Sequence, residues 1–334
     1  MKICIVRPEK DPTKFPIDCV QEIINDQFDE LGPLTETTKI EDLSEALKHE
    51  KEFDFFFIYS SRDAIEFANN GNKKFIFYLN ELEAYDTSSK SYLDCKYAID
   101  KSLFSFVPSV PWIRHYKEFR NKLLYLSRAV RRDKLSTTSG LSTFERPDID
   151  LSNIKLLCLG KNDKSGEDKL NYILCNYFAN KFGLSISFVN AGCDYFSNTE
   201  YNFFEANQKG ECSIICEDHN IFEEQRSDTL ANIIQDHDIL LDFSLHNLES
   251  PSIPQLKASL SGMPTISSHA DVLPDSENAI YQAEPNIASM TSAFQKIIEN
   301  WKLSVDASRQ FASNRNWTDA TKSILGILTK IKNG

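Results

Sequence analysis

Basic side chains are scarce in this chain relative to acidic ones. Its 334 residues include 37 Lys and Arg against 49 Asp and Glu, which gives a formal net charge of −12 at pH 7. A protein whose main ligand is a nucleic-acid backbone normally carries an excess of positive charge. The composition therefore argues against a nucleic-acid partner, although it is compatible with a local basic pocket for a diphosphate.

Long apolar runs are also missing. No stretch approaches the roughly 20 apolar residues that a membrane-spanning helix requires. The first residues, MKICIV, read directly as a strand and not as a signal peptide. The eight cysteines are scattered singly, several of them inside apolar runs, which favours reduced, buried thiols. We therefore expect a cytoplasmic protein.

Several motifs of known chemistry are absent as well. The one close cysteine pair, Cys212 and Cys216, has no second Cys or His pair that would complete a zinc site. The sequence contains no nucleophile elbow, no Walker A loop and no G-x-G-x-x-G dinucleotide fingerprint. We therefore predict neither a zinc centre nor a dinucleotide cofactor.

What the chain does contain is an alternation of strand-like and helix-like segments in both halves. Its length suits two domains of ordinary size, and such alternation predicts parallel sheets covered by helices. The expected fold is α/β, with two Rossmann-like doubly wound domains facing a cleft. The polar stretch KLSTTSGLSTFERPDID contains the boundary, which gives an N-terminal domain over 1–145, a C-terminal domain over 146–316, and a last helix over 317–334 that can pack back on the first.

The sequence predicts several strands and helices with defined bounds. Residues 2–7 and 104–107 read as strands, and the continuous apolar run FDFFFIY at 53–59 reads as a central parallel strand. Helical spacing of apolar residues predicts one amphipathic helix over 115–132 and another over 289–305.

Residues 238–268 are the most informative stretch. They read as a buried strand, a polar loop, a helix and a second strand. Ser252 is a good N-cap, Pro254 falls in the first turn, and Gly262 follows the helix as a C′ residue. A helix that begins just beyond the carboxyl end of a strand presents free backbone N–H groups and the positive end of its dipole. The stretch therefore predicts an anion site.

The same stretch resembles the nucleotide-sugar half of retaining GT-B glycosyltransferases, in the E-x7-E group that is glycosyltransferase family 4-like. The chain departs from the motif at its second glutamate, where it has Lys257. The resemblance covers roughly residues 153–330 and extends over the first half only as architecture. The matching residues are Ser244, Glu249, Pro254, Leu256, Ala258, Gly262, Pro264, Ile266 and Ser267.

The resemblance implies a basic pair that neutralises the leaving diphosphate, in the loop after Gly160. Lys161 and Lys164 match this pair best, and Lys169 is the next choice. The family commonly has Arg at the first position, and a lysine supplies a point charge instead of a bidentate fork. A solvated lysine loop is the alternative.

The resemblance also assigns roles around the helix entry. Glu249 would contact the donor sugar, with a loop glutamate that caps the helix as the alternative. Lys257 stands where a carboxylate usually holds the ribose hydroxyls, and a lysine cannot accept hydrogen bonds from them. The remaining donor-binding candidates are Glu217, placed to meet the base, and Ser250, Ser252 and Ile253, whose backbone N–H groups would meet phosphate or sugar.

The first half should hold the acceptor. Glu81 follows a strand and is the candidate on this side, although the residue pattern favours a solvated acidic loop as the alternative. His115 reads as an ordinary surface or capping histidine. Two D-x-D triplets, at 148–150 and 236–238, fit the linker and the strand entry better than a metal site, so we expect no metal and no cofactor apart from the nucleotide-sugar substrate.

The resemblance thus implies an enzyme that transfers a sugar from a nucleotide sugar to a saccharide or glycoconjugate acceptor, with retention and without metal, in polysaccharide assembly. Lys257 and the missing arginine favour one alternative, a catalytically inactive glycosyltransferase-like partner subunit. A third hypothesis is another doubly wound enzyme, such as an epimerase. A peripheral membrane or partner-protein contact is compatible with each of them.

Overall fold

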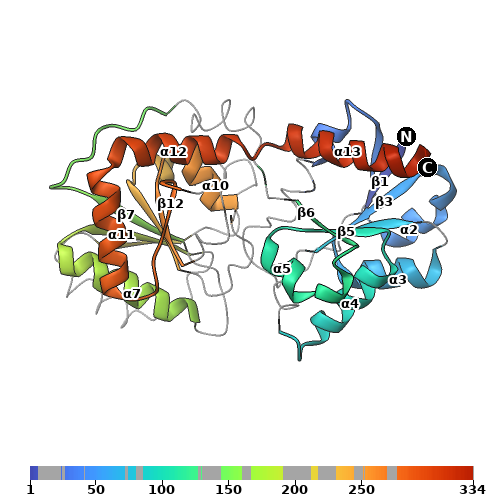
Figure 1. Ribbon diagram of the computed structural model, residues 1–334, viewed down its shortest axis with the longest axis horizontal. Coiled ribbons are helices and arrows are strands. Elements are labelled where there is room, and N and C mark those ends of the chain that lie inside the picture. The colour runs from blue at the N-terminus through green and yellow to red at the C-terminus, as the bar shows by residue number, and fades with distance from the viewer. Residues whose placement is uncertain are drawn as a thin grey trace. The chain divides into compact units, whose positions relative to one another are not determined.

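The computed structural model places most of the chain (Figure 1). It describes residues 1–6, 24, 27–40, 42–71, 74–79, 86–126, 129, 144–159, 167–190, 212–216, 231–243, 251, 253–268 and 277–333. Within these ranges, the side chains at 159, 167–172, 189–190, 212–216 and 253–254 are not described.

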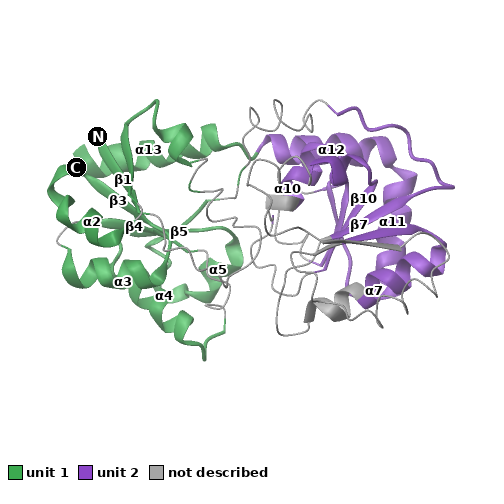
Figure 2. Cartoon of the chain, turned by 180° about the vertical axis from the view of Figure 1, so that it is seen from behind, with its two compact units in different colours: residues 1–14, 18–129, 315–334 green, residues 15–17, 130–314 purple. Residues whose placement is uncertain are grey.

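The chain forms two compact units (Figure 2). Unit 1 comprises Met1–Lys14, Asp18–Ala129 and Arg315–Gly334, and unit 2 comprises Phe15–Ile17 and Val130–Asn314. That the segments 1–145 and 146–316 are domains in their own right stays a prediction.

Unit 1 is built on a parallel six-stranded sheet in the order β2-β1-β3-β4-β5-β6. All four residues of β3 are buried, as the continuous apolar run predicts for a strand covered on both faces. Strand β2, which the sequence analysis did not predict, lies at one edge; its residues alternate between exposed and partly buried up to the buried Ile40. The strands are β1 (Lys2–Val6), β2 (Glu36–Ile40), β3 (Phe55–Ile58), β4 (Phe75–Tyr78), β5 (Phe104–Val107) and β6 (Leu123–Tyr125).

Helices of unit 1 begin at polar caps. The side chain of Asp42 caps α2 (Leu43–Lys48), and Ser60 and Ser89 do the same for α3 (Ser61–Asn70) and α4 (Lys90–Lys101). Between β5 and β6 lie α5 (Val110–His115) and the short 3-10 helix η3 (Lys117–Phe119), and η1 (Glu50–Glu52) precedes β3.

The helix predicted over 115–132 is wrong. Leu123, Leu124 and Tyr125 instead form β6, which pairs in parallel with β5. The apolar spacing suits a helix, but a strand in this place satisfies the backbone groups along the edge of β5, and local periodicity carries no information about that edge.

Unit 2 repeats the plan with a second parallel six-stranded sheet, in the order β12-β11-β10-β7-β8-β9. Its strands are β7 (Lys155–Leu159), β8 (Ser185–Asn190), β9 (Cys212–Cys216), β10 (Ile239–Asp242), β11 (Thr265–Ser267) and β12 (Ile280–Gln282). The expectation of two doubly wound α/β halves is confirmed in this arrangement of strands.

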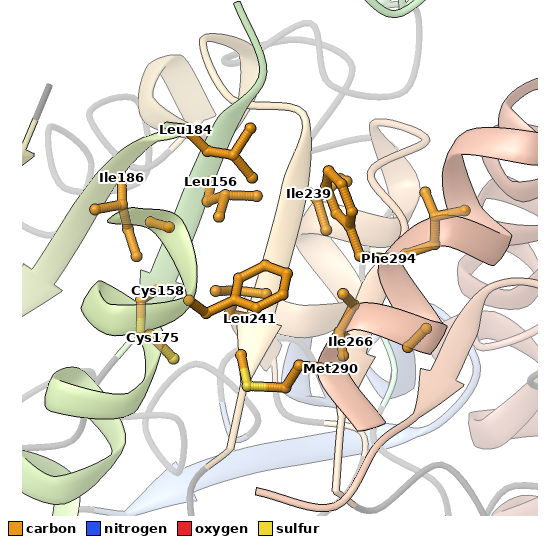
Figure 3. Packing of buried hydrophobic residues seen from close by; sticks show 14 of the residues in the cluster. Leu156, Cys158, Cys175, Leu184, Ile186, Ile239, Leu241, Ile266, Met290 and Phe294 are labelled. Carbon is orange, nitrogen blue, oxygen red and sulfur yellow. The ribbon is translucent and has the colours of Figure 1, made fainter. Parts of the chain in front are cut away.

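Helices α7 (Glu167–Phe182) and α11 (Ile287–Glu299) supply the core on one face of this sheet. In Figure 3, Phe294 of α11 lies beside Ile239, and Met290 lies near Leu241 and Ile266 of the strands. Residues on alternate positions of a strand point to opposite faces, so Leu157 and Leu240, both fully buried, pack on the other side. Two further helices complete this unit, α10 (Ile253–Leu260) and α12 (Trp301–Ser313).

The single helix predicted over 289–305 is two helices. Asn300 ends α11 and begins α12. Its side chain donates to the carbonyl of Lys296 at 2.9 Å, and its backbone N–H bonds the carbonyls of Lys296 and Ile297. Asparagine competes well for such local bonds, and the break lets α12 pack against α10.

The last helix, α13 (Trp317–Asn333), belongs to unit 1. The ammonium of Lys332 lies 2.6 Å from the carboxylate of Asp54, and the hydroxyl of Thr318 donates to Glu30 at 3.1 Å. Within the ranges given above, no helix has the length and apolarity that a membrane crossing requires.

Candidate functional site

The carboxyl ends of β7 and β10 form the topological switch point of unit 2. The chain builds β7, β8 and β9 outward on one side and then returns to place β10 on the other side of β7. Leu241 of β10 pairs with Cys158 of β7, so both strands end at the same edge. In open parallel sheets, ligands bind in the crevice outside this point.

Both loops singled out in the sequence leave the sheet at this switch point. The loop after β7 carries the lysines, and the loop after β10 carries the motif glutamate and leads into α10. These loops are outside the described residues, as is the candidate on the acceptor side. The candidates concerned are Gly160, Lys161, Lys164, Glu217, Glu249, Ser250, Ser252 and Glu81.

Three other candidates lie on described helices. Ile253 is the first residue of α10, and Lys169 is in the first turn of α7, where both helices start near the switch point. Lys257 is one turn into α10 and only 6% exposed. A buried ammonium is costly unless compensated, and Lys257 does interact with another group of the chain. Its role towards ribose stays a prediction.

Glu217 follows an edge strand. Strand β9 is separated from β7 by β8, and neighbouring strands lie about 4.8 Å apart. The carboxyl end of β9 is therefore about 10 Å from that of β7, on the side away from β10. Glu217 itself lies outside the described residues, and its role towards the base stays a prediction.

Arg146 forms hydrogen bonds to the C-terminal ends of two helical segments in unit 2, one of which is α10 of this site. Its guanidinium donates to the carbonyl of Ser261 at 3.3 Å, to the Ser261 hydroxyl at 2.9 Å and to the carbonyl of Ile234 at 3.3 Å, and it also bonds the carbonyl of His237. Carbonyls at helix C-terminal ends lack intrahelical partners. One arginine thus satisfies the ends of α10 and of the helical residues 231–235.

The segment around Arg146 is held by residues far along the chain, which is why the sequence did not indicate its structural role. The carbonyl of Phe144 accepts from Arg309 at 2.6 Å, and that of Pro147 accepts from the indole of Trp301 at 3.1 Å. The segment 144–150 is therefore bound to α12. Burial lowers the pKa of Arg146 to about 10, and the carboxylate of Asp238 opposes this shift. In the sequence it is one cation in a polar stretch.

The buried His237 is expected to make the stability of unit 2 sensitive to acid. Burial lowers its pKa below the ordinary 6.5, and its Nδ1 bonds the carbonyl of Ile233 at 2.6 Å. The unfolded chain takes up this proton more readily, so stability is unaffected above about pH 6.5 and is lost as the pH falls below it. The His237→Asn variant should lose less stability between pH 7 and pH 5, measured by urea denaturation at both. Equal losses in the two proteins would contradict this prediction.

The first sheet has its own switch point, between β1 and β3. Tyr59 follows β3 there, donates to the side-chain carbonyl of Gln27 and lies 5.5 Å, between ring centroids, from Tyr78 at the end of β4. Burial raises the pKa of Tyr59, and Tyr78 adds to the effect. The sequence analysis treated this tyrosine as part of an apolar run, so this buried polar cluster was missed.

Other candidates have structural roles. The ring of His115 makes edge contacts with Tyr92, Trp112 and Tyr116 in unit 1. Asp238 accepts from the backbone N–H of Lys155 at 2.8 Å, and Asp150 caps its own turn through Ser152. Among the residues that the structure places, no group of three or more His, Cys, Asp or Glu side chains is arranged to hold a metal.

Comparison with known proteins gives matches at the level of structure. No protein-family model and no curated protein match the sequence. An α-glucosyltransferase solved with UDP and a 13-mer DNA containing a HMU base matches with a TM-score of 0.65 and 13% identity, over 98% of this chain and 99% of that one. HepE of Anabaena solved with UDP has a TM-score of 0.65 and 10% identity over the same shares, and with UDP-glucose a TM-score of 0.63.

These likenesses show the GT-B fold for this chain. They also correct the exclusion of nucleic acid that was based on net charge. A protein that matches almost the whole chain was solved with DNA bound, so the fold accommodates a nucleic acid. Net charge is a sum over the chain, whereas binding depends on where the charges lie.

Proposed function

We propose that this chain is a glycosyltransferase that moves a sugar from a nucleotide-sugar donor to an acceptor. One observation carries the proposal: β7 and β10 end side by side at the switch point of unit 2. The lysine loop and the loop with Glu249 leave from these two strand ends. Cations and the start of α10 would thus approach a diphosphate from two sides.

The chemistry follows from these groups. The leaving diphosphate gains negative charge as the sugar departs, and preorganised cations and backbone N–H groups stabilise that charge. Lys161 and Lys164 act as point charges, the first turn of α10 supplies N–H groups, and Glu249 orients the sugar. The E-x7-E resemblance supports retention of configuration, a reaction without metal and no cofactor beyond the donor.

The proposal extends to the acceptor and to the cellular setting. We infer a saccharide or glycoconjugate acceptor bound by unit 1, with Glu81 nearby, and a role in polysaccharide assembly. Four described cysteines, Cys4, Cys95, Cys158 and Cys175, are free and buried, which supports a reducing, cytoplasmic setting.

Nucleotide binding tests the proposal directly. The matched structures hold UDP or UDP-glucose, so UDP is titrated first by calorimetry, then GDP and dTDP. The Lys161→Ala/Lys164→Ala variant should bind at least about 100-fold more weakly, because each hydrogen bond to a charged group contributes about 1.5–3 kcal/mol.

The matched control is Lys181→Ala/Lys296→Ala, which removes two exposed lysines from α7 and α11 and should bind as the unaltered protein does. Equal affinity of the Lys161/Lys164 variant and this control would mean that the lysine loop is only solvated. No heat with any nucleotide would favour the inactive partner subunit, which the replacement of the second motif glutamate by Lys257 supports.

A further inference from the structure

Three exposed cations follow one another at three-residue spacing in unit 1. Arg114 is in the last turn of α5, Lys117 begins η3, and Arg120 follows η3 directly. The one acid in this segment, Glu118, pairs with Lys96 at 2.8 Å. Across the ranges that the structure places, none of the three cations has an acidic side chain within ion-pair distance. We call these three residues the cation row.

The backbone aligns two members of the cation row, Lys117 and Arg120, at η3. Four backbone hydrogen bonds connect residues between Trp112 and Lys122, and Tyr116, with non-helical dihedrals, separates α5 from η3. Trp112 and Tyr116 are fully buried and fix the inner side. Residues three apart in a 3-10 helix eclipse each other, about 6 Å apart along the axis, which aligns Lys117 with Arg120.

The segment is anchored at its far end. The ammonium of Lys122 donates to the carbonyl of Ser102 at 3.2 Å and also bonds that of Asp100, both at the C-terminal end of α4. The next residues form β6, the edge strand of the sheet. The cation row is therefore a rigid surface beside a sheet edge, with Tyr125 of β6 43% exposed next along the chain.

We propose that the cation row binds the phosphodiester backbone of a nucleic acid. The three regularly spaced cations have no acid within ion-pair distance among the described residues, although Glu118 lies close enough to Lys117 to feel its charge. In a chain with a net charge of −12, such a row matches a polymer that carries a phosphate at every residue. The two arginines offer planar forks that suit phosphate oxygens. An anionic membrane also attracts cations, but binding in its interface needs an apolar face beside them, and Tyr125 is the one exposed large apolar side chain within residues 110–125.

The test is fluorescence anisotropy with a labelled single-stranded oligonucleotide and with a duplex, without nucleotide sugar. The Arg114→Ala/Lys117→Ala/Arg120→Ala variant should bind the single strand about 100-fold more weakly at 0.1 M salt, since three phosphate contacts are lost. The slope of log Kobs against log salt should fall in magnitude by about 2. Because the assay contains no donor, its failure leaves the proposed sugar transfer untouched.

The matched control is Lys296→Ala/Lys302→Ala/Lys330→Ala, which removes three exposed cations elsewhere and should retain affinity. Equal loss in both variants would overturn the proposal, as would unaltered protein that binds neither oligonucleotide or binds without dependence on salt. Phosphatidylserine vesicles form the second arm. Binding to vesicles but not to oligonucleotides would assign the cation row to a membrane surface and overturn it too.

Discussion

Replacement of Arg146 by alanine is expected to lower the free energy of unfolding of unit 2 by about 3–5 kcal/mol, because a hydrogen bond to a charged group contributes about 1.5–3 kcal/mol and several such bonds are lost. The variant leaves the carbonyls of His237 and Ser261 without the Arg146 donor. The carbonyl of Ile234 loses one of two donors, because it also accepts from the backbone N–H of His237 at 3.4 Å. Each orphaned buried acceptor costs about 1–3 kcal/mol. The measurement is urea denaturation followed by tryptophan fluorescence, to which Trp301 contributes from the same region.

The controls separate geometry from charge. Arg146→Lys keeps the cation but cannot reach three carbonyls at once, so it should recover less than half of the loss. Lys302→Ala removes an exposed cation of α12 and should change stability by less than about 0.5 kcal/mol. Full recovery in the lysine variant would show that charge alone, and not the fork of bonds to helix ends, explains the role of Arg146.

Gly262→Ala should destabilise unit 2 by about 2–5 kcal/mol. Gly262 has a φ of +81°, and a Cβ there would lie 2.8 Å from Val305 Cγ1 and 3.1 Å from Arg309 Nε. A side chain in the left-handed region costs about 1–2 kcal/mol, and overpacking adds about 1–3 kcal/mol. The added methyl would push α12 away from the end of α10. Calorimetry should show the resulting loss of stability as a lower Tm.

Gly326→Ala is the matched control for Gly262→Ala. Gly326 lies within α13, and a Cβ at this position meets nothing within 4 Å. Gly326→Ala should therefore stabilise unit 1 by about 0.5–1 kcal/mol, because alanine is the better helix former. A neutral effect of Gly262→Ala would contradict the close approach of α10 and α12.

Local chemistry in the sequence was sufficient for much of the fold. The run at 53–59 predicted a central parallel strand, since a strand covered on both faces needs apolar residues at successive positions, and β3 (Phe55–Ile58), which follows Asp54, is that strand. Gly262 was predicted at the end of a helix, and its positive φ confirms this. These features depend on neighbours in sequence, so the pattern of residues carries them.

Other features depend on partners far along the chain. Leu123–Tyr125 became a strand because β5 offered a free edge, and Arg146 bonds carbonyls about 90 and 115 residues away. The adjacency of β7 and β10 decides that the lysine loop and the Glu249 loop leave one edge together. The sequence by itself determined the elements and the candidate residues, and only the tertiary structure decided which of them meet, because hydrogen bonds and packing between distant segments leave no periodic trace in the chain.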